Sequence, residues 1–238
     1  MQRLDSERTA NQLRSFETEF DIIKSADGSV KYSQGKTTVI VGVYGPIEVK
    51  QKKEKAGTSF IEVSVTSEDG IQHERDIEYA IFIRNTLENV IHTKMHPLTS
   101  ITVAIQIVSD DGSLFATIIN AVCLSLLICG IEMKCLFSAT NFLIEKKNNE
   151  INKKIFIDPL KREEENQIRK QNDNILDSSQ KALVTIVVDN VSFASLAIFT
   201  DGLIDENVLF RCIELSKMSG KTIFNFIKLA LQKKLEKN

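Results

Sequence analysis

The sequence lacks the features that mark several large classes of protein. It has 30 Lys and Arg residues against 32 Asp and Glu residues, a formal net charge of −2, so no overall positive charge favours nucleic-acid binding. The motifs HExxH, GxxxxGK[ST], GxSxG and GxGxxG do not occur. Zinc proteases, P-loop NTPases, hydrolases with a nucleophile elbow and dinucleotide-binding enzymes therefore lose support. A local basic patch that contacts RNA stays compatible with this composition.

The cysteines show no CxxC spacing, and two of them fall within an apolar helical pattern; the four are Cys123, Cys129, Cys135 and Cys212. This arrangement favours reduced core residues over disulfides or zinc ligands. The first 20 residues are charged and contain no apolar run of the secretory type. The run 114–131 approaches transmembrane length but contains Thr117, Asn120 and Ser125. A buried core helix is therefore favoured, and no membrane association is expected.

The segment from residue 99 to residue 131 is the centre of the predicted fold. It reads as a strand over 99–108, a tight acidic turn at 110–112, and then one long helix that ends at Gly130 and is apolar on nearly every side. A helix N-terminus after a strand often holds phosphate, because its first N–H groups have no partner. Asp110 and Asp111 occupy this turn without any Lys or Arg, which makes it a poor phosphate site. We expect Asp111 or Ser113 to cap the helix.

The rest of the chain mixes hairpins with strand–helix crossovers. Strands are expected at 30–32, 37–44, 60–65, 134–144, 155–157, 182–189 and 192–200. Helices are expected at 73–91, 205–218 and 221–234, the last two separated at Ser219–Gly220. The pattern predicts an α/β (α+β) fold of mixed β-sheets packed with helices. A polar arm over 1–20 would precede one domain over 21–238, with a charged insertion around 145–181 that is either an exposed helix or a flexible segment.

Two groups of side chains could carry metal or acid–base chemistry. His92 and His96 are four residues apart and could share a helix face, but Pro97 follows and no third ligand is evident. Asp158 ends a predicted strand and precedes the acidic run 163–165, and such carboxylates can bind a divalent metal or transfer protons. Charged runs are also typical of solvated surfaces, and the residues alone leave both interpretations open.

Three segments resemble the RNase PH family. They read DGSVKYSQGKTTVIVGVYGP (27–46), ERDIEYAIFIRNTLENVI (74–91) and MHPLTSITVAIQIVSDDGSLFATIINAVCLSLLICGI (95–131). The resemblance covers roughly residues 20–235 and is weakest over 145–181. It implies an RNase PH-like fold with ribosomal S5 domain 2-like topology. The motifs are closest to the branch that forms ring subunits of the eukaryotic RNA exosome.

Active members of that family degrade RNA from its 3′ end with inorganic phosphate, an arginine in a Gly-Thr-Arg-Thr turn, and acids near a divalent metal. In this chain the turn begins at Gly112 and Ser113, and Leu114 replaces the arginine that would bind phosphate through two parallel hydrogen bonds. The acidic positions fall on Asp158 and Glu164, and the third acid has no match near 181–182. The resemblance therefore implies a degenerate site with no catalytic residue, no metal and no cofactor.

The resemblance implies that some of the family's RNA-contacting arginines are kept in this chain. Of the paired arginines of active members, the first is Glu74 here and the second is Arg75, and a further arginine matches Arg84. The expected RNA-binding residues are Arg75 and Arg84, with weaker candidates in Lys31 and Lys50.

The resemblance implies a non-catalytic ring subunit that lines an RNA channel for 3′–5′ RNA degradation and rRNA processing in the nucleus, nucleolus and cytoplasm. Expected partners are other RNase PH-like exosome subunits, RNA-binding cap subunits, a processive nuclease and single-stranded RNA, and the isolated chain could form a homodimer. Three alternatives remain. They are an active phosphate-dependent exoribonuclease that uses Asp158 and Glu164, a metal-dependent hydrolase built on the same acids, and a scaffold that does not contact RNA.

Overall fold

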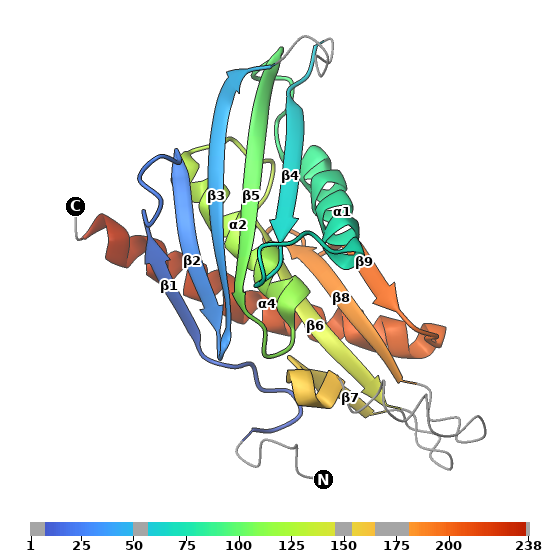
Figure 1. Cartoon of the computed structure of the whole chain (residues 1–238). Coiled ribbons are helices and arrows are strands. Elements are labelled where there is room, and N and C mark those ends of the chain that lie inside the picture. Colours follow the sequence, from blue (N-terminus) through green and yellow to red (C-terminus); the bar gives the residue numbers. More distant parts are fainter. Residues whose placement is uncertain (1–7, 50–56, 146–153, 165–180, 237–238) are drawn as a thin grey trace.

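The computed structural model describes residues 8–49, 57–145, 154–164 and 181–236, which form two β-sheets and the helices packed on them (Figure 1). The five-stranded sheet has the order β1-β2-β3-β5-β4 and the four-stranded sheet the order β7-β6-β8-β9. The strands are β1 (Phe16–Phe20), β2 (Gly28–Gln34), β3 (Thr37–Glu48), β4 (Phe60–Thr66), β5 (Thr99–Ser109), β6 (Phe137–Glu145), β7 (Lys154–Ile157), β8 (Lys181–Asp189) and β9 (Ser195–Asp201). All neighbouring pairs are antiparallel except β4 and β5, which are parallel, so the larger sheet is mixed as expected.

Helix α2 (Leu114–Cys129) lies between the two sheets, packed on β2 and β3 on one side and on β6 on the other. Every residue from Phe115 to Leu126 is buried, which explains why the helix is apolar on all sides. Its polar side chains have partners: Asn120 donates to the carbonyl of Ala139 at 3.0 Å and accepts from the Ala139 N–H at 2.8 Å. The expected buried core helix is therefore confirmed. Among the described residues, no helix combines the length and apolar character needed to cross a membrane.

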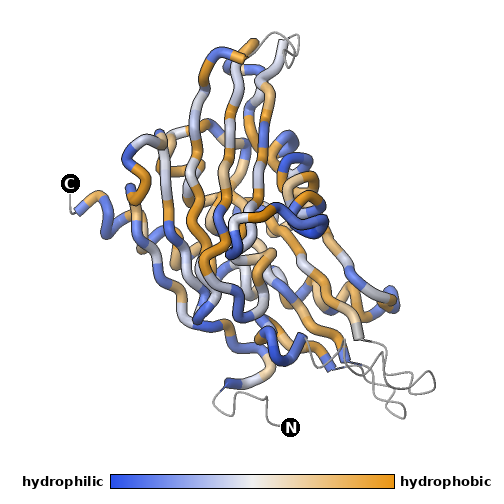
Figure 2. The backbone as a smooth tube through the Cα atoms, in the orientation of Figure 1, coloured by the Kyte–Doolittle hydropathy of each residue, from blue (hydrophilic) through white to orange (hydrophobic). Residues whose placement is uncertain are grey.

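Two further helices cover the outer surfaces. Helix α1 (Glu74–Val90) packs beside β4, and helix α4 (Glu206–Leu235) runs behind both sheets, where it contacts β6, β8 and β1 (Figure 1). Strands β6 and β8, which α4 contacts, consist mostly of hydrophobic residues (Figure 2). Of the four cysteines, Cys123 and Cys212 are buried and all four are unpaired. Burial raises the pKa of the Cys123 thiol to about 12, which makes it an inert core residue.

The beginning of the chain differs from the expected polar arm. Residues 16–20 form β1, which pairs antiparallel with β2 and places Phe16 5.2 Å from the Phe226 ring of α4. The sequence Phe-Glu-Thr-Glu-Phe is only five residues long, and its two glutamates make it look like part of the polar arm rather than a strand. Of the charged insertion, residues 161–164 are helical, and residues 146–153 and 165–180 lie outside the described part of the chain.

The predicted break at Ser219–Gly220 is wrong, because α4 is one continuous helix of 30 residues. Gly220 allows α4 to pack closely against the four-stranded sheet. A Cβ atom at this position would lie 2.8 Å from Cγ2 of Val188 and 3.2 Å from Oγ of Ser138, both on the four-stranded sheet. Ser219 is also a packing residue, since its hydroxyl lies 2.8 Å from that of Thr140 on β6. Glycine lowers helix propensity, yet tertiary contact decides the outcome at this position.

We expect Gly220→Leu to lower the free energy of unfolding by about 1–3 kcal/mol, because the added side chain overpacks the contact between α4 and β8. Urea titration of the purified protein measures this difference. Thr222→Leu, on the exposed face of the same helix, should change stability little. Val188→Ala should recover part of the loss in the Gly220→Leu background. A Gly220→Leu variant as stable as the wild type would contradict the packing role.

Candidate functional site

A cavity of about 630 Å³ lies where α1, the N-terminus of α2 and the second sheet meet. Its lining includes both aromatic and acidic side chains. The residues that line it include Arg75, Tyr79, Phe82, Asp110, Leu114, Phe115, Asn141, Glu164, Phe199 and Asp201. The structure thus brings the 110–115 segment and Glu164 into one hollow, although they are about 50 residues apart in the chain.

The turn before α2 is pressed against the segment that follows β7. Gly112 adopts a φ of +90°, and a Cβ atom there would collide with the backbone of residues 159–161, so only glycine fits. Ser113 is the N-cap residue of α2, but its hydroxyl donates to the carbonyl of Pro159 at 3.1 Å and makes no capping hydrogen bond to the helix. Its N–H donates to Oε1 of Glu164 at 2.9 Å. Ser113 thus occupies the expected N-cap position, but the expected capping hydrogen bond from its side chain is absent.

Arg14 and Asp158 are joined by four hydrogen bonds. The backbone N–H of Arg14 donates to Oδ2 at 2.8 Å, its Nε to both carboxylate oxygens at 3.0 Å, and its Nη2 to Oδ1 at 2.7 Å. Asp158 has no exposed surface. Burial alone would raise the pKa of this carboxyl, but the hydrogen bonds and charge of Arg14 outweigh burial and lower it.

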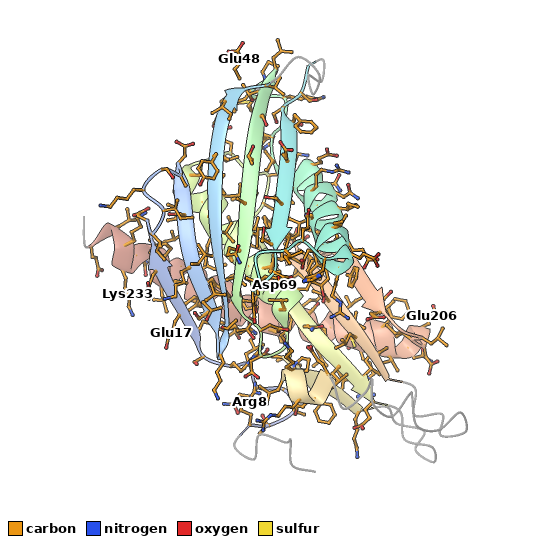
Figure 3. All side chains as sticks on the ribbon, in the orientation of Figure 1. Arg8, Glu17, Glu48, Asp69, Glu206 and Lys233 are labelled. Carbon is orange, nitrogen blue, oxygen red and sulfur yellow. The ribbon has the colours of Figure 1, made fainter. Side chains whose placement is uncertain are left out.

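The same guanidinium group also holds the turn. Its Nη1 donates to the carbonyl of Asp111 at 2.9 Å and its Nη2 to that of Gly112 at 2.8 Å. Thr37 at the start of β3 completes the set, donating to the Gly112 carbonyl at 2.8 Å and accepting from the Asp111 N–H at 3.0 Å. Arg8, labelled in Figure 3, approaches Oδ2 of Asp158 at 3.6 Å from the N-terminal segment. Asp158 is thus enclosed by cations and does not line the cavity.

Glu164 is the carboxyl of the pair that faces the cavity. Burial raises its pKa to about 7, with the Ser113 N–H opposing the rise and the charge of Asp110 adding to it. Besides the Ser113 N–H, Oε1 accepts a longer hydrogen bond from the amide of Asn141 at 3.4 Å. Asp110 itself pairs with Lys161 at 3.0 Å. Near neutral pH, Glu164 therefore exists as a mixture of its protonated and ionised forms.

An aromatic cluster fills the space at the first turn of α2. Phe115 stacks on Tyr79 with ring centroids 4.2 Å apart and meets Phe82 and Phe199 edge-on at 5.2 Å and 5.1 Å. Leu114 precedes it and lines the cavity. Arg75 is the one basic residue among the described residues that line this hollow. A doubly charged phosphate would therefore meet apolar rings and carboxylates at this helix end, and only one cation.

The residues predicted to bind RNA do not all lie together. Arg75 is exposed at the rim of the cavity, and Arg84 lies on the same helix with its buried Nε making no hydrogen bond to a described residue. Lys31 is on β2, toward the sheet edge opposite α1, and pairs with Glu19 of β1 at 3.1 Å. Lys50 lies outside the described residues.

The structure offers no support for a histidine metal site. His92 and His96 are exposed beyond the end of α1. Within the described parts of the chain, no three His, Cys, Asp or Glu side chains are grouped to hold a metal ion.

Sequence reasoning missed Arg14 altogether. It belongs to a charged stretch that gave no sign of burial, and its partner is 144 residues away in the chain. A single sequence carries no signal for such a pairing. It also missed the aromatic cluster, whose members are distributed over α1, α2 and β9.

We expect Arg14→Met to lower the free energy of unfolding by about 3–5 kcal/mol, because it leaves a buried carboxylate without its partner. Chemical denaturation at pH 7 measures the loss. The double variant Arg14→Met/Asp158→Leu should be more stable than the sum of its single variants predicts. Arg162→Met removes an exposed arginine of the neighbouring turn and serves as the matched control. Equal stabilities of Arg14→Met and Arg162→Met would contradict the role assigned to Arg14.

Glu164 should make the protein less stable as pH rises. Its folded pKa is about 7 and its ordinary value 4.5, so between these values the folded state binds a proton that the unfolded state has lost. Stability therefore falls across this window, by at most about 3 kcal/mol for this group. Glu164→Gln should flatten the decline between pH 5 and pH 8 in urea titrations. Glu206→Gln, on the exposed start of α4, should keep the wild-type slope; a Glu164→Gln protein with that same slope would refute the assignment.

Comparison with known proteins agrees with the fold expected from the motifs. The RNase PH model, described as 3′ exoribonuclease family, domain 1, matches residues 12–132. An Oryza sativa subsp. japonica protein, exosome complex exonuclease RRP46 homolog, is 29% identical over 230 residues, covering 95% of this chain and 94% of the relative. The protein of the same name from Arabidopsis thaliana is 34% identical over 155 residues, covering 62% of this chain and 65% of its own length.

Solved structures give the same result. The crystal structure of rice Rrp46 matches with a TM-score of 0.82 at 28% identity, covering 96% of this chain and 100% of that one. An archaeal exosome core chain matches with a TM-score of 0.70 at 18% identity over 95% of this chain and 91% of its own, a likeness of fold alone. The expected RNase PH-like α+β fold is confirmed. The two sheets enclosing α2, together with a family match over residues 12–132, show that the chain belongs to the RNase PH family.

Proposed function

We propose that this chain is a non-catalytic RNase PH-like ring subunit of the eukaryotic RNA exosome, of the RRP46 type also called exosome component 5. Its role would be to complete the ring and line the RNA path during 3′–5′ RNA degradation and rRNA processing. The Oryza sativa relative that matches along 94% of its length is named as an exosome complex RRP46 homolog, and the rice structure that matches along its whole chain is of Rrp46, which supports this assignment. The expected cellular location is the nucleus and nucleolus, and also the cytoplasm.

The observation that carries the non-catalytic assignment is the engagement of Asp158 by Arg14. A carboxylate with no exposed surface and four hydrogen bonds from one arginine has no free oxygen for a divalent metal. Leu114 and Phe115 occupy the first turn of α2, where an arginine would be needed to bind phosphate. Asp110 and Glu164 add negative charge beside it. Binding phosphate here would therefore cost free energy.

The proposed RNA contact follows α1. Arg75 is exposed at the rim of the cavity and forms no ion pair with a described residue. Arg84 lies nine residues further along the same helix, on the opposite side of its axis, and is half-buried, so Arg75 is the main candidate on α1 and Arg84 would make a separate contact. Ile77 and Ile81 are also exposed, at 46% and 47%, and are suited to contact with a neighbouring subunit. The partners proposed are other RNase PH-like subunits, RNA-binding cap subunits, the processive nuclease and single-stranded RNA.

One observation favours the alternative of an active phosphate-dependent 3′–5′ exoribonuclease. The pKa of Glu164 is raised to about 7, the range that suits a general acid or base. Against it stands Asp158, the other acid this mechanism needs, which is buried behind Arg14. Activity would then have to proceed with one carboxyl, a single rim arginine and no arginine in the turn.

Purification of the native complex and an assay of the chain itself test the proposal together. We expect mass spectrometry to find RNase PH-like partners, and the purified chain to release no nucleoside diphosphates from 3′-labelled RNA when phosphate and Mg²⁺ are added. Ultraviolet crosslinking of RNA in the assembled complex should fall several-fold on Arg75→Glu. Arg211→Glu, the same charge change on an exposed arginine of α4, should leave it unchanged.

Each rival has its own outcome. Nucleoside diphosphate release that depends on phosphate and disappears in Glu164→Gln would establish the active enzyme. If the Arg75→Glu variant crosslinks to RNA as well as the wild type does, the result would support the alternative of a scaffold that RNA does not contact through α1. A chain that co-purifies with no RNase PH-like partner would overturn the ring assignment.

A further inference from the structure

A second hollow, of about 490 Å³, lies along α4 beside the turn between β8 and β9. We call it the α4 groove and define it by Phe193, Lys221, Phe224, Ile227, Lys228 and Leu231. It lies at the turn end of the β8–β9 hairpin, whereas the first cavity is lined by Thr200 and Asp201 at the other end of β9. We propose that the α4 groove docks a short acidic peptide segment of a protein partner, with apolar side chains between its carboxylates.

The floor of the groove is apolar and fixed. Ile227 is 1% exposed and belongs to the main core, and Phe224 and Leu231 pack against that core while keeping part of their surface open. A concave, mostly apolar surface with a few polar groups at its rim is the usual form of a binding site. This groove is therefore able to accept one or two apolar side chains of a partner.

Phe193 forms one wall in an unfavourable backbone conformation. Its φ is +52°, a region that bulky residues rarely adopt and that costs about 1–3 kcal/mol. The turn around it is held by Asp189, which accepts from the N–H groups of Ser192 at 3.1 Å and Ala194 at 3.0 Å. Such strain persists where surrounding contacts enforce it, and it is concentrated at functional surfaces. Here it places the Phe193 ring 6.2 Å from that of Phe224, so the two rings form adjacent parts of the groove.

The rim of the groove is positive in a chain whose net charge is −2. Lys221 and Lys228 are both exposed, and neither forms an ion pair with a described residue. The Lys221 ammonium lies 5.2 Å from the centre of the Phe193 ring, which holds it over the groove. None of the described lining residues is acidic. The complementary ligand therefore carries negative charge at its ends and apolar surface in its middle.

The spacing of the two lysines gives the length of that ligand. They are seven residues apart on one helix, about 10 Å along its axis. An extended chain covers this distance in about three residues. A segment with acidic residues three or four positions apart and one or two apolar residues between them fits both lysines and the floor.

The chemistry favours a peptide over RNA. Single-stranded RNA sites offer open aromatic faces on which bases stack. Here the rings of Phe193 and Phe224 meet edge-on at 63°, and one face of Phe193 is covered by Lys221. Ile227 and Leu231 on the floor match aliphatic side chains.

Selection from a displayed library of random 12-residue peptides on the immobilised full-length chain tests this proposal, with Lys221→Glu/Lys228→Glu as counter-selection. We expect the enriched peptides to share two acidic residues three or four apart around Leu, Ile, Phe or Met. Fluorescence polarisation with a synthetic peptide of that consensus should show at least tenfold weaker binding to the double variant. Lys217→Glu/Lys233→Glu makes the same charge change on exposed residues of α4 outside the groove and should bind as the wild type does.

Three outcomes would overturn the proposal. They are no enrichment over the counter-selected variant, enriched peptides without acidic residues, and equal loss of binding in both double variants. A labelled oligouridine is measured in parallel: its loss on Lys221→Glu/Lys228→Glu, with peptide binding unchanged, would make the groove an RNA site instead. Matching thermal melting curves show that all variants fold. The result does not depend on the ring assignment, since it is obtained on the isolated chain.

Discussion

The interaction between Arg14 and Asp158 holds together three parts of the chain that are far apart in sequence. Arg14 precedes β1, Asp158 follows β7, and the turn at Asp111–Gly112 leads into α2. The guanidinium group of Arg14 hydrogen-bonds to the other two parts. Since β1 belongs to the five-stranded sheet and β7 to the four-stranded sheet, this contact also joins the two sheets at the end where α2 begins. It therefore fixes the turn at the N-terminus of α2, beside which the first cavity lies.

The turn before α2 and the segment that follows β7 form one structural frame at the N-terminus of α2. Gly112 still makes the close approach to the segment 159–161 that brings Glu164 to the N-terminus of α2. Phe115 points into an aromatic cluster with Tyr79, Phe82 and Phe199, which gives that helix end a packing role. Architecture and activity are separable properties, and a frame of this kind can serve assembly alone.

The elements that could be predicted from sequence were those with long, regular patterns. Helix α1 was expected at 73–91 and spans Glu74–Val90, and α2 and β5 also lie where periodicity placed them. Strand β1 was missed because its pattern is five residues long and includes two glutamates. The false break in α4 arose because Gly220 is read locally as a helix breaker, while its packing on Val188 is visible only in three dimensions. Motif resemblance identified Asp158 and Glu164, but only the structure shows that one is enclosed and the other faces a cavity.

A buried ion pair is often no more stable than an apolar pair of the same volume, so its presence here needs a reason. The reason lies in the backbone of the turn. The carbonyl groups of Asp111 and Gly112 both accept from the Arg14 guanidinium, and an apolar side chain would leave them with fewer donors in a buried place. Arg14 must be charged to make these bonds, and a buried charge needs a counterion, which Asp158 supplies. The carboxylate is therefore needed by the fold itself, and this need would preserve Asp158 even where no RNA is cleaved.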